Sequence, residues 1–146
     1  SAWYHFVISV DTSNSTAAYK ARVYVNGEEI TSFSTDHRSS GDFASTGINL
    51  ASNPHYIGCT TPGYMAYTGY LADMYLIDGQ ALTPTSFGEF FNGIWIPKVY
   101  NPGNDALTDY GTNGFHLTFA PSTIPTGTNT VQDVSGRNNH WTASGF

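Results

Sequence analysis

An alternation of side chains at the start of the chain predicts a β-strand over residues 3–10. Alternate side chains of a strand point to opposite faces, so Trp3 and His5 lie on one face. The opposite face carries Tyr4, Phe6, Ile8 and Val10. Both faces therefore carry aromatic or apolar side chains, and this pattern is typical of an interior strand rather than an exposed edge.

A second strand is expected over residues 21–25, where Val23 and Val25 share a face opposite Tyr24. Residues 11–16 are polar and predict a loop between the two strands. Asn26-Gly27 follows the second strand, and both residue types tolerate positive φ, which makes the pair a strong hairpin signal. We expect residues 3–10 to pair antiparallel with residues 21–25.

The pattern is weaker further along the chain. Residues 31–54 predict a long loop with one short strand at 47–50. Further strands are expected at 56–59 and at 69–79, the latter ending in an Asp-Gly turn. The sequence of residues 83–90 starts with an N-cap threonine and a proline at the first helical position, which predicts a single short helical turn.

Composition excludes several classes of protein. The chain has 146 residues, which suits one domain, and its net charge is -6 with only 11% charged residues. The basic residues form no cluster, which argues against nucleic-acid binding; they are Lys20, Arg22, Arg38, Lys98 and Arg137. The single cysteine, Cys59, excludes an intrachain disulfide and is expected to be a small buried apolar residue in its strand. No apolar run approaches the roughly 18 residues of a membrane span.

Three motifs resemble the concanavalin A-like, or laminin-G-like, jelly-roll family. The hairpin W-Y-H-F-V-I-S-V-D … V-Y-V-N-G is similar to one in the middle of that domain, and residues 78–84, D-G-Q-A-L-T-P, are similar to the turn after its last core strand. Residues 133–141, D-V-S-G-R-N-N-H-W, resemble the segment that opens the domain. The resemblance implies an all-β fold, an antiparallel jelly-roll β-sandwich whose order is permuted or N-terminally truncated.

This resemblance gives an expected organisation. Residues 1–146 form a single β-sandwich domain, with a laminin-G-like core at 1–90 and a loop-rich extension with closing strands at 91–146. The segments 95–100, 110–119 and 133–141 are similar to segments of virion and tail proteins of marine bacteriophages. The same fold carries lectins, enzymes and structural parts, so the site has to decide the function.

The carboxylates argue against an enzyme. Glucanases related to this family need two carboxylates on one strand, spaced as E-x-D-x-x-E, and no such run occurs here. Glu28 and Glu29 are consecutive in a turn, and Asp73 and Asp78 lie on opposite faces of a continuous strand. A nucleophile elbow is absent from the sequence, so we expect no catalytic residues.

A calcium ion is the one cofactor that the resemblance suggests. Relatives bind Ca²⁺ through Asp, Asn and backbone oxygens on loops at the sandwich edge, which places a site at Asp133, Asn138 and Asn139. The alternative is that Asp133-x-Ser135-Gly136 makes an Asx-type turn and that the two asparagines satisfy the backbone of the loop.

Aromatic side chains are the remaining candidates for binding. They can stack on sugar faces or anchor a protein interface, and the alternative for at least half of them is core packing. The candidates are Tyr64, Tyr67, Tyr70, Trp95, Tyr100 and Tyr110.

The sequence thus predicts a non-catalytic structural or adhesion protein of a phage virion: a head decoration, fibre or tail-associated protein. Its partners would be other virion subunits or copies of itself, since a chain that begins at an interior strand leaves sheet edges open to another chain. The alternative is an extracellular lectin-like module, with or without calcium, that binds cell-surface or environmental polysaccharide.

Overall fold

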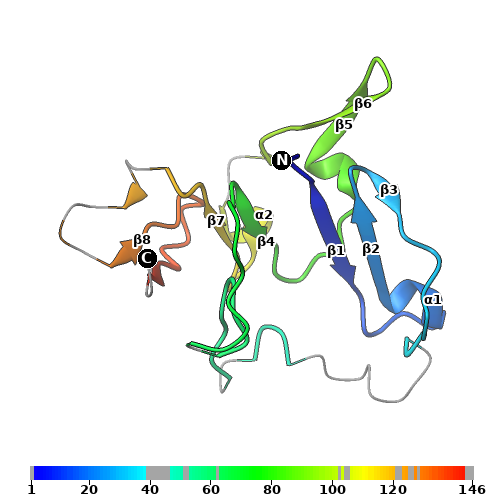
Figure 1. Ribbon diagram of the computed structural model, residues 1–146, viewed down its shortest axis with the longest axis horizontal. Helices are drawn as coiled ribbons and strands as arrows, with labels where there is room; N and C mark the ends of the chain where they lie inside the picture. Colours follow the sequence, from blue (N-terminus) through cyan, green and yellow to red (C-terminus); the bar gives the residue numbers. More distant parts are fainter. Residues whose placement is uncertain are drawn as a thin grey trace. The chain divides into compact units, whose positions relative to one another are not determined.

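The computed structural model describes residues 2–38, 47–50, 53–61, 63–101, 103, 106–120, 123–124, 127 and 129–143. These residues are rich in strands, with only short helical segments between them (Figure 1). The chain divides into two compact units. Unit 1 comprises Ser1–Thr46 and Gln80–Pro102, and unit 2 comprises Gly47–Gly79 and Gly103–Phe146. Each unit is therefore built from two separate stretches of sequence.

Unit 1 contains the hairpin that the sequence predicts. β1 (Phe6–Val10) pairs antiparallel with β2 (Ala21–Val25), which pairs with β3 (Glu28–Glu29) in the order β1-β2-β3. Asn26 and Gly27 join β2 to β3 at φ values of 50° and 83°, as a two-residue hairpin turn requires. The loop before β2 holds a short helix that the sequence analysis missed, α1 (Ala17–Lys20).

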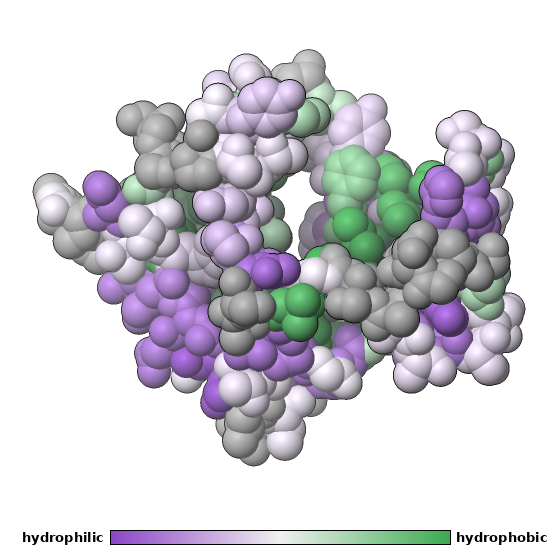
Figure 2. Space-filling view, turned by 90° about the horizontal axis from the view of Figure 1, so that it is seen from below, coloured by the Kyte–Doolittle hydropathy of each residue, from purple (hydrophilic) through white to green (hydrophobic). Residues whose placement is uncertain are grey.

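The position of β1 differs from the prediction of an interior strand. Among the described residues β1 pairs with β2 alone, so it lies at the edge of its sheet. Phe6 and Ile8 are 64% and 66% exposed. They share a face with Val25 and Val23, their partners across the ladder. Figure 2 shows hydrophobic side chains gathered at the surface over β1 and β2.

A second hairpin completes unit 1. The predicted helical turn is the 3-10 helix η2 (Pro84–Ser86), and it leads directly into β5 (Gly88–Phe91), which pairs antiparallel with β6 (Ile94–Pro97). Asn92 and Gly93 form the turn at φ values of 49° and 78°. The sequence analysis missed this hairpin, although an Asn-Gly pair between apolar residues is a strong signal for one.

Trp95 of β6 lies between two glycines of unit 1. A Cβ atom at Gly27 or at Gly88 would collide with the indole ring, so both positions require glycine. The indole Nε1 donates a hydrogen bond of 2.9 Å to Nδ1 of His5, and Phe90 packs edge-on against the ring at 5.0 Å. Burial lowers the pKa of His5, which suits its role as an acceptor because Nδ1 must stay unprotonated to receive the indole proton.

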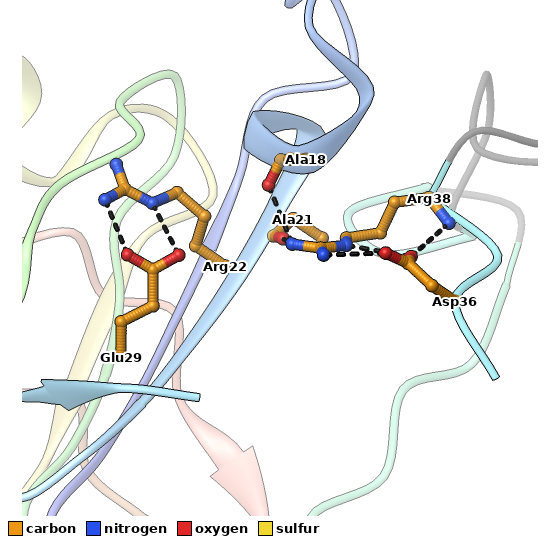
Figure 3. Close-up of polar contacts among 6 residues, drawn as sticks. All are labelled: Ala18, Ala21, Arg22, Glu29, Asp36 and Arg38. Atoms are coloured by element: carbon orange, nitrogen blue, oxygen red, sulfur yellow. Dashed lines mark hydrogen bonds and ion pairs between the residues drawn. The ribbon is translucent and has the colours of Figure 1, made fainter. Parts of the chain in front are cut away.

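Two arginines of unit 1 are bound by carboxylates of the same unit (Figure 3). Arg22 donates two hydrogen bonds to Glu29 across the β2–β3 ladder, the shorter 2.8 Å long. Arg38 binds Asp36 at 2.7 Å and donates to the carbonyl oxygens of Ala18 and Ala21 at the end of α1. The hydrogen bonds from Arg38 lower the pKa of Asp36 to about 2. Both guanidinium groups are therefore paired with carboxylates of their own unit.

Unit 2 is built on a strand pair from distant parts of the sequence. β4 (Met74–Leu76) pairs antiparallel with β7 (Phe115–Leu117), and β8 (Thr130–Val131) pairs with β9 (Trp141–Thr142). The helix α2 (Ala106–Tyr110) precedes β7. Phe115, Leu117 and Val131 form the buried core, and Trp141 packs edge-on against Phe115 at 5.1 Å.

Three predicted strands need correction. Residues 47–50 and 56–59 form bends and turns, because Gly47, Asn49 and Gly58 adopt positive φ, which no strand accommodates. Cys59 is half-buried but not in a strand. The strand expected at 69–79 is reduced to β4, since Asp73 at φ 47° ends it on one side. The described strands form one three-stranded and three two-stranded sheets, which establishes a β-rich fold but not yet a two-layered sandwich.

Candidate binding site

A group of exposed tyrosines lies in unit 2 on residues 63–71, which we call the tyrosine loop. Its entry is a turn in which Tyr64 N donates to Thr61 O at 2.9 Å and Thr60 N donates to Tyr64 O at 3.3 Å. Tyr67 N then donates to Gly58 O at 2.6 Å. Gly58 adopts φ 81°, a conformation that favours glycine. Backbone hydrogen bonds to residues 58–61 therefore hold the tyrosine loop in place.

Side chains of the tyrosine loop project into solvent. Tyr64 is 65% exposed, Met65 69% and Tyr70 83%, while Tyr67 and Leu71 are about half exposed. The Tyr67 ring covers Gly69, where a Cβ atom would collide with it, and its hydroxyl donates to Tyr70 O at 3.5 Å. Tyr67 thus braces the loop, whereas Tyr64 and Tyr70 present their rings outward. Exposed aromatic and Met side chains in one segment are typical of an interaction surface.

A carboxylate lies just after the tyrosine loop. The side chain of Asp73 is 60% exposed, and its Oδ1 lies 3.0 Å from Nε2 of His116. The His116 ring is buried and stacks on Tyr75, its neighbour across the β4–β7 ladder, with centroids 4.0 Å apart. His116 is thus a buried strand residue whose ring is hydrogen-bonded on one side and stacked on the other. One carboxylate oxygen of Asp73 is hydrogen-bonded to His116, while the side chain as a whole remains largely exposed to solvent.

The other predicted aromatics do not join this surface. Tyr100 and Tyr110 are buried, at 5% and 8% exposure, so neither ring is presented at the surface of its unit. Tyr100 packs against Phe87, with ring centroids 5.1 Å apart. Trp95 is half-buried against Gly27 and Gly88 and serves the core of unit 1. Of the predicted set, only Tyr64, Tyr67 and Tyr70 form one exposed group.

The predicted calcium residues lie on the loop between β8 and β9, where Asp133 is buried at 7% exposure. Its Oδ1 accepts hydrogen bonds of 2.8 Å from His116 N and from Ser135 N. Its Oδ2 accepts from Ser135 Oγ at 2.9 Å and from Asn139 N at 3.0 Å. Burial alone would raise the pKa of Asp133, but these hydrogen bonds outweigh it and lower the pKa below the usual 3.8.

The side chain of Asn139 binds backbone carbonyl oxygens rather than the Asp133 carboxylate. Asn139 Nδ2 donates to the carbonyl oxygens of Thr112 and Gly114, at 3.1 and 2.8 Å. Asn138 is exposed and adopts φ 62°, a turn conformation that asparagine tolerates. His140 Nδ1 accepts a hydrogen bond from Asp133 N at 3.0 Å. This arrangement matches the Asx-type turn that the sequence left as the alternative to calcium.

The Asp133 loop does not fit a calcium ion as it stands. Both carboxylate oxygens already accept two hydrogen bonds each, and Asn139 turns its amide nitrogen to the backbone. Within the described part of the chain, no group of three or more His, Cys, Asp or Glu residues is arranged to hold a metal ion.

Calcium should therefore leave the stability unchanged. We expect the melting temperature in millimolar CaCl₂ to equal that in a chelator, because an ion would have to displace the donors around Asp133 before it could bind. Differential scanning calorimetry measures this, with MgCl₂ as the ionic-strength control. A rise seen with calcium and absent with magnesium would restore the predicted site.

Comparison of the chain with models of known families, with curated proteins and with solved structures finds no match. Among the described residues, no helix is long and apolar enough to cross a membrane.

Proposed function

We propose that the chain is a non-catalytic structural or adhesion protein of a bacteriophage particle, a head decoration, fibre or tail-associated protein, that contacts its partners through the tyrosine loop. The observation that carries this proposal is the exposure of Tyr64, Met65 and Tyr70 in one braced segment. Large aromatic and Met side chains are enriched where protein interfaces are fully buried, and charged residues are depleted there. The tyrosine loop contains no charged residue.

The same proposal includes the virion as the location of the protein and the jelly-roll β-sandwich as its fold. The predicted jelly-roll β-sandwich of the concanavalin A-like kind is supported by the β1–β2 hairpin and by η2, which begins at the proline that ends the D-G-Q-A-L-T-P segment. Only 11% of the residues are charged, against about 25% in an average domain, so few charges have to be desolvated where neighbouring subunits cover the surface.

Site-specific photo-crosslinking tests this function. A photoreactive phenylalanine analogue at position 70, in particles that incorporate the chain, should link it to a particle protein. The same analogue at position 19 is the matched control, because Tyr19 is also exposed, at 53%, but lies on α1 of unit 1. Equal crosslinking from both positions, or none from position 70 in intact particles, would contradict the proposal.

A lectin-like module is the second candidate function. The observation that favours it is Asp73, whose exposed carboxylate follows the tyrosine loop and can accept hydroxyl hydrogen bonds beside a stacked sugar. Affinity electrophoresis in gels that contain polysaccharides distinguishes the two functions. Retardation that Tyr70→Ala abolishes and Tyr19→Ala leaves intact would favour the lectin over the particle subunit.

We also expect no glycoside hydrolase activity. Glu29 is held by Arg22, and Asp78 accepts hydrogen bonds from the Asn49 side chain at 2.7 Å and from Asn113 N at 3.1 Å. Carboxylates engaged in this way are not a facing pair across a scissile bond. Reducing-sugar release from β-glucans should stay at the level of a buffer blank. Release that a single substitution at Asp73 or Asp78 abolished would show the chain to be an enzyme.

A further inference from the structure

Among the described residues, no strand pairs with the outer edge of β1. Asn26 N donates to His5 O and Asp11 N donates to Lys20 O, so the odd-numbered residues of this strand face β2. In an antiparallel ladder the alternate residues then direct their N–H and C=O groups to the other side. In the part of the chain that the structure describes, no second strand pairs with that side. The outward residues within β1 are Phe6, Ile8 and Val10.

This edge lacks the features that prevent strands from pairing between chains. Natural edge strands are protected by charges, proline or bulges. Residues 2–10 contain no Lys, Arg, Asp, Glu or Pro, and the β1–β2 register runs from Phe6 to Val10 without a bulge. Apolar side chains on both faces are typical of a strand whose two faces are covered rather than open to solvent.

The exposed side chains of β1 and of the residues just before it are large enough to support an interface. Trp3, Tyr4, Phe6 and Ile8 are 69%, 60%, 64% and 66% exposed. With about 150–250 Å² for each aromatic side chain, they present about 500 Å² per copy, or about 1,000 Å² for two copies. A specific interface needs about 1,000 Å² of total buried area, and the paired backbone edge adds to this.

We propose that two copies of the chain pair through their β1 edges, antiparallel about a two-fold axis, so that two three-stranded sheets become one six-stranded sheet. A second copy is the fitting occupant because both edges are neutral, and the symmetric arrangement brings no like charges together. In antiparallel pairing, Asp11 of each copy lies toward residue 3 of the other rather than beside its own equivalent. This dimer uses unit 1 and is independent of the tyrosine loop.

Analytical ultracentrifugation of the whole chain, over about 1–100 μM, tests the proposal. The sedimentation mass of the wild type should rise from the 15.8 kDa of one chain toward twice that value as the concentration increases. Ile8→Lys places a charge in the interface and should raise the dimer dissociation constant at least about tenfold. Ile94→Lys is the matched control, because Ile94 is equally exposed at 68% but lies on β6, and it should leave the dimer intact. Tyr70→Ala should also remain dimeric, which separates this result from a failure of the proposed function.

Amide hydrogen exchange gives a readout that needs no variant. The amides of Phe6 and Ile8 should exchange at least about tenfold more slowly at high protein concentration than at low concentration, because the second copy binds them. A wild-type chain that is monomeric at all concentrations would overturn the proposal. So would concentration-independent protection of these amides, which would place another part of the same chain on the edge. Equal dissociation by Ile8→Lys and Ile94→Lys would move the interface away from β1.

Discussion

Replacing Gly27 by alanine should destabilise unit 1 by about 2–4 kcal/mol, whereas the same change at Gly93 should cost about 1 kcal/mol. Both glycines occupy the second position of an Asn-Gly turn at nearly the same φ, 83° and 78°. A Cβ atom at Gly93 meets no atom within 4 Å, but one at Gly27 would enter the Trp95 ring. The difference between the two variants therefore isolates the packing of Trp95 from the cost of positive φ.

The indole ring has little room to move away from a new methyl group. Gly88 lies against the indole ring, and His5 accepts a hydrogen bond from its N–H. Phe90 packs edge-on against it, with ring centroids 5.0 Å apart. Overpacking against a fixed ring typically costs 1–3 kcal/mol. Urea unfolding followed by circular dichroism measures both variants, and equal losses for Gly27→Ala and Gly93→Ala would show that Trp95 does not pack between the glycines.

The second large effect concerns Asp133. Asp133→Asn should destabilise unit 2 by about 2–4 kcal/mol, because the new amide nitrogen would oppose a donor where Oδ2 now accepts from Asn139 N. Asp73→Asn is the matched control. Asp73 is largely exposed, makes a hydrogen bond to His116 and adopts a φ of 47° that asparagine tolerates. Asp73→Asn should therefore lower the free energy of unfolding by less than about 1 kcal/mol.

The same carboxylate gives a pH dependence with a definite sign. Because folding lowers the pKa of Asp133 from 3.8, its contribution is present above that pH and is lost as the pH falls through the folded-state value. Acid titration of the unfolding free energy should therefore show a smaller loss below pH 3.8 for Asp133→Asn than for the wild type. Identical acid profiles, or equal destabilisation by the two Asp→Asn variants, would mean that the hydrogen bonds around Asp133 contribute nothing.

Local signals in the sequence were sufficient for the first hairpin. Alternation over residues 3–10 and the Asn26-Gly27 pair predicted β1, β2 and their antiparallel pairing, because side-chain direction and positive φ are properties of neighbouring residues. The helical turn after Thr83 followed in the same way from a proline at its first position. The Asx-type turn at Asp133 was also visible as an alternative, since its bond to Ser135 N spans two residues.

Tertiary structure decided which of the candidate aromatics are exposed. Nothing in the sequence separates Tyr70, 83% exposed, from Tyr100, 5% exposed, because exposure depends on whether a distant segment covers the ring. Trp95 likewise depends on Gly27, a residue of another hairpin, and the fourfold binding of Asp133 depends on His116 N of β7. The sequence alone determined the first hairpin, the helical turn after Thr83 and the Asx-type turn at Asp133. Burial, the β4–β7 pairing and the edge position of β1 arise from contacts between residues far apart in the chain.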